Sequence, residues 1–205
     1  MVADIVQLDA TIDKFLDYAR PDHVTLTTVN LHAVVSSCVY AVQDHRELQI
    51  SMDVPEGLYV RADEVELARV VSNLLENARR YGKSPDTDTA QVEVTAKARE
   101  NWVVMRIRDH GQGVPPEQLA RLTQPFFRGD SARTAAAGAG LGLSIVDKTV
   151  QRMGGVFALS NTASGGLAAH IQLQRATSLP DGKDPEQRLQ RPQVKRQLPP
   201  RAKQA

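Results

Sequence analysis

The chain has 205 residues, of which 41% are hydrophobic, enough for one substantial core but too few for two large domains. No run approaches the ~18 consecutive apolar residues of a membrane span, and the first residues lack the basic start and apolar centre of a signal peptide. The one cysteine, Cys38, cannot form an internal disulfide. These features favour a soluble domain in a reducing, cytoplasmic compartment.

The charge divides the chain into two parts. The formal net charge is +1, but residues 175–205 carry eight Lys or Arg against three Asp or Glu, so this tail is +5 and the remainder is −4. Pro, Gln, Arg and Lys dominate the tail, and large apolar residues are almost absent. We therefore expect a disordered tail, and a solvated tail is favoured over one that binds nucleic acid or lipid.

Residues 1–20 have the pattern of an amphipathic helix. Apolar residues recur at three- and four-residue steps, and the pattern ends at Arg20-Pro21, where a helix should stop. One apolar stripe needs a surface to cover it. That surface lies either in the same domain or on another helix, and the polar residues 22–28 that follow favour the second arrangement.

The rest of the chain alternates between strand and helix patterns. Asn30 can cap one helix, and Asp63 with Glu66 resembles a capping box at the start of another. Together the predicted elements favour an α/β fold, an α+β two-layer sandwich in which a mixed sheet carries helices on one face. The patterns predict helices over residues 31–45, 63–80 and 141–153, and strands over 48–54, 58–62, 91–98, 102–108, 156–160 and 167–173.

The helix predicted over residues 63–80 carries a polar strip on a different side from its apolar residues, and we expect this strip to face a ligand. At one hundred degrees per residue, Glu66, Asn73, Asn77 and Arg80 share that strip. The amide oxygen of Asn77 is a hard, neutral ligand that suits Mg²⁺ and leaves room for water and phosphate oxygens. Without further signals downstream, the same residues would form an ordinary solvated helix face.

The segment Asp109-His-Gly-Gln-Gly113 follows the predicted strand 102–108. A carboxylate at a strand end is an acceptor that suits the exocyclic amino group of adenine. Gly111 and Gly113 permit a backbone that a Cβ would block, so the chain can approach a base closely. Taken alone, these residues would be read as an Asp-Gly turn.

A second glycine cluster, Gly138, Gly140 and Gly142, precedes and enters the helix that begins near Leu141. Free N–H groups and the helix dipole at such a start can bind phosphate oxygens. Residues 123–139 form a loop of small residues that could close over a nucleotide as a lid. We expect Phe126 and Phe127 to anchor the lid and Arg128 to neutralise charge, although ordinary packing explains the two Phe residues equally well. The segments together predict a pocket for ATP with Mg²⁺.

In this order, and with Pro125-Phe-Phe-Arg-Gly-Asp130 between the glycine segments, the motifs resemble the ATP-binding domain of bacterial sensor histidine kinases. That domain belongs to the superfamily shared by gyrase, the 90-kDa heat-shock chaperone and mismatch-repair ATPases, with the Bergerat-type ATP-binding fold. The segment 125–134 is most similar to osmolarity-sensing kinases. The resemblance covers about residues 1–174 and implies three parts, a dimerisation helix at 1–20, a catalytic domain at 21–174 and the tail at 175–205.

The resemblance also implies roles for site residues. It makes Asn77 the Mg²⁺ ligand and places Arg80 and Tyr81 near the phosphates and nucleoside. Hydrolytic members of the superfamily have a Glu general base where this chain has Asn73, and an amide cannot accept a proton at neutral pH. The pocket should therefore hold ATP for transfer and hydrolyse it slowly. Glu76, beside the strip, is a weaker candidate for orienting a nucleophile.

The family transfers the γ-phosphoryl group to a histidine on the first helix of a dimerisation hairpin. None of the five histidines here (His23, His32, His45, His110 and His170) lies in the family's acceptor context. We therefore expect residues 1–20 to be the second hairpin helix, able to support a homodimer, and the acceptor hairpin to come from another or a longer chain. A response regulator would be the downstream partner, and full-length relatives are inner-membrane proteins with this domain on the cytoplasmic side. Two alternatives remain, an ATP-binding regulatory module without transfer activity and a hydrolysing ATPase.

Overall fold

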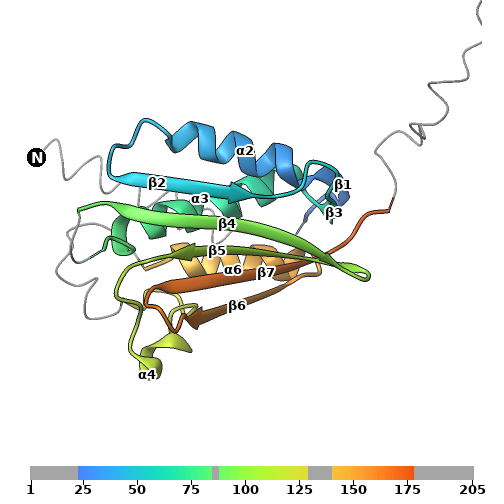
Figure 1. Cartoon of the computed structure of the whole chain (residues 1–205). Helices are drawn as coiled ribbons and strands as arrows, with labels where there is room; N and C mark the ends of the chain where they lie inside the picture. The colour runs from blue at the N-terminus through green and yellow to red at the C-terminus, as the bar shows by residue number, and fades with distance from the viewer. Residues whose placement is uncertain (1–22, 85–87, 129–139, 178–205) are drawn as a thin grey trace, which may run out of the picture.

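The computed structural model describes residues 23–84, 88–128 and 140–177. A five-stranded sheet forms one layer, and helices pack on one of its faces as the second layer (Figure 1). The predicted mixed sheet with helices on one face is thus confirmed. The elements are β1 (Thr27–Asn30), α2 (Leu31–Val42), β2 (Leu48–Asp53), β3 (Tyr59–Ala62), α3 (Glu64–Tyr81), β4 (Ala90–Arg99), β5 (Trp102–Asp109), α4 (Pro116–Leu119), α6 (Gly142–Arg152), β6 (Val156–Asn161) and β7 (Leu167–Gln174).

The sheet has the strand order β2-β4-β5-β7-β6. β2 and β4 are parallel because α3 lies between them in the chain and carries it back across the layer. The pairs β4–β5 and β6–β7 are antiparallel hairpins, as predicted, and β5 also pairs antiparallel with β7. This order brings the end of β5 beside the start of β7, where part of the functional pocket forms.

Two features of the first third of the domain differ from the sequence prediction. Residues 27–30, expected to be mostly a polar connection, form β1, which pairs with β3 in a separate two-stranded sheet. Only Val29 of β1 is buried, so the strand has no alternating pattern that would reveal it. The helix expected to reach His45 ends at Val42, and the two strands that follow it belong to different sheets.

The predicted N-caps of α2 and α3 form, but one residue of the polar strip predicted on α3 lies elsewhere. The Asn30 side chain accepts a hydrogen bond from the N–H of Ala33, and Asp63 accepts from the N–H groups of Val65 and Glu66. Glu66, however, does not belong to a ligand-facing strip, so that expectation is wrong. Its carboxylate is buried against α6, where Arg152 Nη2 lies 3.6 Å away.

The core fills the space between the sheet and α3. Alternate residues of β4 and β5, including Val94 and Met105, are buried beneath the apolar face of α3, which includes Leu75. Because that face is fixed by burial, the neighbouring face of α3, which carries Asn73 and Asn77, is held at the pocket. None of the helices in the described part of the chain combines the length and apolar character needed to cross a membrane.

The end of the domain remains attached beyond residue 174. The Arg175 N–H donates to Asn101 O at 2.8 Å, and the Ala176 N–H donates to Tyr59 O at 3.0 Å. These contacts continue past the domain boundary predicted from composition. The predicted helix at 1–20 and the tail from residue 178 lie outside the described residues.

Candidate nucleotide pocket

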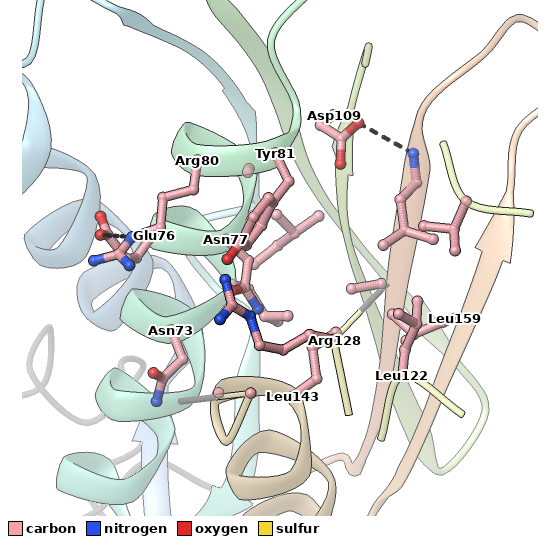
Figure 2. A pocket seen from close by; sticks show the side chains of 18 of the residues that line it. Asn73, Glu76, Asn77, Arg80, Tyr81, Asp109, Leu122, Arg128, Leu143 and Leu159 are labelled. Atoms are coloured by element: carbon pink, nitrogen blue, oxygen red, sulfur yellow. Dashed lines mark hydrogen bonds and ion pairs between the residues drawn. The ribbon is translucent and has the colours of Figure 1, made fainter. Parts of the chain in front are cut away.

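A pocket opens between α3, the end of β5, the start of β7 and the start of α6 (Figure 2). It gathers side chains and backbone that the sequence places in separate motifs. The residues predicted for the nucleotide site that line this pocket are Asn73, Asn77, Arg80, Tyr81, Asp109, Gly113, Phe127, Arg128, Gly140, Leu141 and Gly142.

Other residues of the predicted site lie elsewhere. Gly111 does not line the pocket, because it packs on the end of α3, where an added Cβ would lie 2.9 Å from Gly82 Cα. Phe126 is 61% exposed and does not line it either. Gly138 and residues 129–139 of the expected lid lie outside the described part of the chain.

Asp109 lies half-buried at one end of the pocket. Its Oδ1 accepts hydrogen bonds from the N–H of Gly111 at 2.9 Å and of Leu167 at 3.1 Å. Burial raises the pKa of the carboxyl group, and these two N–H donors oppose that shift. With Oδ1 occupied in this way, Oδ2 is the oxygen left to accept a hydrogen bond from a ligand.

At the other end of the pocket, Asn73, Asn77 and Tyr81 lie one helical turn apart on α3. The start of α6 approaches this face closely, since a Cβ on Gly142 would lie 3.6 Å from the Asn77 amide. Asn77 Nδ2 is buried without a hydrogen-bond partner among the described residues. Figure 2 shows the Arg128 side chain reaching toward Asn77 from the opposite wall.

These residues fit a cation bound together with phosphates. The described residues contain no group of three or more His, Cys, Asp or Glu side chains that could hold a metal by themselves. Mg²⁺ retains several waters and is commonly held by one or two protein ligands plus phosphate oxygens. The amide oxygen of Asn77, which lies beside the start of α6, is therefore the atom that suits this cation when a nucleotide supplies the remaining ligands.

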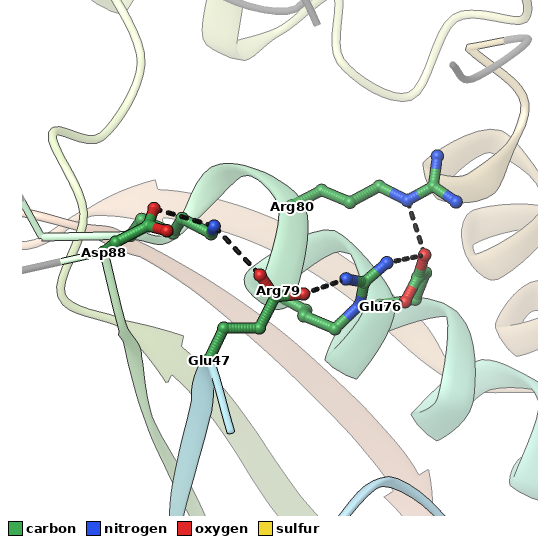
Figure 3. A network of polar contacts seen from close by, with 6 residues as sticks. Glu47, Glu76, Arg79, Arg80 and Asp88 are labelled. Carbon is green, nitrogen blue, oxygen red and sulfur yellow. Dashed lines mark hydrogen bonds and ion pairs between the residues drawn. The ribbon is translucent and has the colours of Figure 1, made fainter. Parts of the chain in front are cut away.

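Glu76 lies at the pocket edge but is held in an ion-pair network that runs away from it (Figure 3). It accepts from Arg79 Nε at 2.7 Å and from Arg80 Nε at 2.5 Å, and Arg79 in turn pairs with Glu47. The hydrogen bond from Arg79, joined by that from Arg80, lowers the pKa of Glu76 to about 2 despite its partial burial. Because a carboxylate with this pKa is a weak proton acceptor, Glu76 is poorly suited to act as a general base.

The start of α6 is open to an anion. Leu141 occupies the N-cap position and makes no side-chain capping hydrogen bond, so the cap residue leaves the first N–H groups of the helix without its help. Gly140, just before it, has a φ of +69°, a conformation that favours glycine. The N–H of Phe126 donates to Gly140 O at 3.0 Å, which joins this turn to the segment carrying Phe127 and Arg128.

Gly140→Ala is expected to weaken ATP binding roughly tenfold or more, because the new Cβ would lie 2.8 Å from Phe127 O and push that segment out of the pocket. Gly154→Ala is a matched control. Gly154 has a similar φ of +73°, but nothing lies within 4 Å of its added Cβ. Titration calorimetry on both variants separates the effect of crowding at the pocket from backbone strain alone. Equal ATP affinity in the two variants would contradict the proposed closeness of this turn to the ligand.

The sequence did not reveal the apolar wall of the pocket. These side chains come from β5, β6, β7, α6 and the segments on either side of α4, and they give a ligand ring a surface to pack against. Inward alternation along the strands identifies some of them as part of the core, but only the folded sheet shows that they also border a space for a ligand. They include Ile107, Val114, Leu122, Leu143, Leu159, Leu167 and Ala169.

A family model described as "Histidine kinase-, DNA gyrase B-, and HSP90-like ATPase" matches residues 62–177, more than half of the chain. The chain belongs to this ATPase family. Within the family, its similarity is to sensor histidine kinases. It is 33% identical to the signal transduction histidine-protein kinase/phosphatase MprB of Mycolicibacterium paratuberculosis, over 81% of this chain and 31% of that protein.

Two solved structures have the same fold. The histidine kinase domain of the E. coli osmosensor EnvZ is 31% identical, with a TM-score of 0.54 over 79% of this chain and 96% of that one. Full-length ShkA in complex with AMPPNP is 25% identical, with a TM-score of 0.70 over 83% of this chain and 36% of that one. The chain spans about a third of the length of the curated relatives that it matches. The matched part of the chain is the ATP-binding catalytic domain of sensor histidine kinases.

Proposed function

We propose that the chain binds Mg²⁺-ATP and transfers the γ-phosphoryl group to a histidine that lies outside the described residues, in two-component signal transduction. The observation that carries this proposal is the arrangement of the pocket ends. A half-buried acceptor, Asp109, lies at one end, and the open start of α6 faces Asn77 at the other. An adenine amino group suits the first end, and phosphates suit the second.

Each wall has a proposed role. Asn77 is the metal ligand, and the N–H groups at Leu141 and Gly142 donate to the phosphates. When bound, Mg²⁺ would neutralise charge on the phosphate oxygens. Arg128, which points toward Asn77, adds a second positive charge from the opposite wall. Tyr81 lies beside the nucleoside. The chain's own residues thus position the phosphates and stabilise their charge, which supplies most of the catalysis in phosphoryl transfer.

The alternative of rapid ATP hydrolysis is less well supported. Water attack in the hydrolytic relatives needs a general base, and this pocket has the amide of Asn73 at the family's Glu position. Glu76 is the acidic side chain nearest to it along α3, and its pKa of about 2 disfavours proton abstraction. A regulatory module that binds ATP without transfer remains the second alternative, and the experiment below distinguishes all three.

The histidines in the described residues are poor acceptors for this site. None of them lines the pocket. His32 Nδ1 lies 2.6 Å from Val54 O, His110 Nε2 lies 2.9 Å from Glu93, and His170 Nε2 lies 2.9 Å from Ser160. The acceptor is therefore proposed to be a dimerisation hairpin, supplied by a longer chain or in trans. A response regulator would receive the phosphate next, on the cytoplasmic side of a membrane-bound relative.

Mixing this chain with radiolabelled ATP, Mg²⁺ and a separately supplied hairpin from a related kinase is expected to label the hairpin with acid-labile phosphate. No histidine of this chain should be labelled. Transfer should be slow, because diffusion replaces the high effective concentration of a tethered acceptor. Free phosphate without labelled hairpin would favour the hydrolysing ATPase, and bound ATP without either product would favour the regulatory module. Label on one of the five histidines here would contradict the proposed acceptor.

A further inference from the structure

The loop after β5 is held in place by a side chain from a distant part of the chain. Asn161, the last residue of β6, pairs with the main chain of Val114 in both directions. Its Oδ1 accepts from the Val114 N–H at 3.0 Å, and its Nδ2 donates to Val114 O at 2.6 Å. Asn161 thus provides the donor and acceptor that a neighbouring strand would otherwise offer to Val114.

The residue before Val114 is shaped to allow this pairing. Gly113 has a φ of +73°, and a Cβ there would lie 2.8 Å from Asn161 Oδ1. A side chain at position 113 would therefore disturb the Asn161 hydrogen bonds as well as the approach of a ligand. Gly113 and Val114 both line the pocket, so the Asn161 amide fixes part of the pocket wall without lining it.

The other end of the same hairpin turn holds Asp109. The Leu167 N–H donates to Asp109 Oδ1 at 3.1 Å, and an added Cβ on Gly166 would lie 1.9 Å from Asp109 O. Arg108 Nη2 donates to Ser164 Oγ at 2.6 Å and ties the turn to β5. The β6–β7 hairpin therefore holds segment 109–114 by hydrogen bonds at both ends, from Leu167 to Asp109 and between Asn161 and Val114.

We propose that Asn161 is a positioning residue for the base end of the nucleotide pocket. Its two hydrogen bonds to Val114 set the distance between the loop 113–114 and the Asp109 carboxylate, and so set the width of the slot that receives the base. The proposal rests on the proposed function, in which the base lies at Asp109. It assigns Asn161 no direct contact with the nucleotide.

The test uses calorimetric titration of adenosine and of ATP into the whole chain. Asn161→Ala is expected to weaken both ligands by the same factor, about threefold to tenfold, because two exposed hydrogen bonds of ordinary strength are lost at the end that both ligands share. Ser160→Ala is the matched control. Ser160 is the preceding residue of β6, and its hydroxyl group hydrogen-bonds with His170 Nε2 at 2.9 Å and not with Val114. This control should bind both ligands as the unmodified chain does.

A second variant gives a readout that simple loosening of the fold would not produce. Asn161→Asp keeps the acceptor for the Val114 N–H but puts a carboxylate oxygen against Val114 O. At neutral pH it should bind adenosine more weakly than Asn161→Ala. Near pH ~5 the introduced carboxyl begins to protonate and regains a donor, so its affinity relative to the unmodified chain should recover. The ratio of the adenosine affinity of Asn161→Ala to that of the unmodified chain should stay constant with pH. Titration of Asp109 changes both affinities in each ratio equally, so its effect cancels.

Two outcomes would overturn the proposal in distinguishable ways. If the unmodified chain binds adenosine and both Asn161 variants bind it as tightly as the unmodified chain does, Asn161 does not position the pocket, while the proposed function stands. If the unmodified chain binds ATP but its affinity is independent of the base, the base does not lie at Asp109, and this proposal fails with that part of the proposed function. Thermal melting of each variant, recorded alongside, identifies any loss caused by unfolding.

Discussion

Replacing Asp109 by asparagine is expected to cost most of the ATP affinity and to remove the preference for ATP over GTP. The new Oδ1 can keep both main-chain hydrogen bonds, from Gly111 and Leu167. The new Nδ2 then stands where Oδ2 faced the ligand, so a donor meets the donor of the adenine amino group. A buried polar pair left unsatisfied in this way costs about 1–3 kcal/mol, or roughly a factor of 5 to 150 in the dissociation constant.

The same substitution should leave the fold as stable as before, or more stable. Burial raises the pKa of Asp109, so the unfolded chain loses this proton at a lower pH than the folded chain. As pH rises through the interval between the two pKa values, the folded state loses stability, and the loss persists at higher pH. The Asp109→Asn variant carries no charge at this position and avoids this loss. Thermal unfolding near neutral pH measures the difference.

Together the two measurements distinguish a ligand-binding role from a structural one. Weaker ATP binding with unchanged or greater stability is the expected combination. In the unmodified chain, ATP affinity should also fall as acid protonates Asp109, since a protonated carboxyl is a poorer acceptor, whereas the variant should show no such dependence. Equal affinities for ATP and GTP in the unmodified chain would refute the assignment of Asp109 to adenine.

Asn77→Ala is expected to weaken ATP binding strongly when Mg²⁺ is present and only slightly in EDTA. The side chain is proposed to reach the phosphates through the metal, so its contribution disappears when the metal is chelated. Removal of one of the few protein ligands of such a cation should lower the affinity by roughly tenfold to a hundredfold. Calorimetric titrations with and without Mg²⁺ give the two affinities.

Asn73→Ala provides the matched control for this experiment. Asn73 lies one helical turn earlier on the same face of α3 and lines the same pocket. We place it nearer the water shell of the metal, so its loss should be milder. An equal loss for Asn77→Ala with Mg²⁺ and in EDTA would mean that this amide shapes the pocket and does not bind the metal.

The sequence predicted the parts of this domain that depend on local pattern. Helix periodicity placed Asn73 and Asn77 on one face of α3, and the glycines marked the start of α6, because these signals are contained within one or two turns. Glu66 was misplaced because its partner, Arg152, comes from a helix far along the chain. The strand β1 and the hydrogen bonds between Asn161 and Val114 were not predicted for the same reason. Each depends on a pairing between segments that are far apart in the sequence.

The sheet order has a consequence for how the domain is made. β7 is the last strand along the described residues, yet it lies between β5 and β6 and not at an edge of the sheet. It also brings Leu167 and Ala169 to the pocket and the N–H that holds Asp109. During synthesis, the earlier strands emerge from the ribosome before their central neighbour exists. A chain cut short before β7 would therefore lack more than its last strand, since β6 would lose its only pairing partner in the described sheet and the nucleotide site would lose one wall.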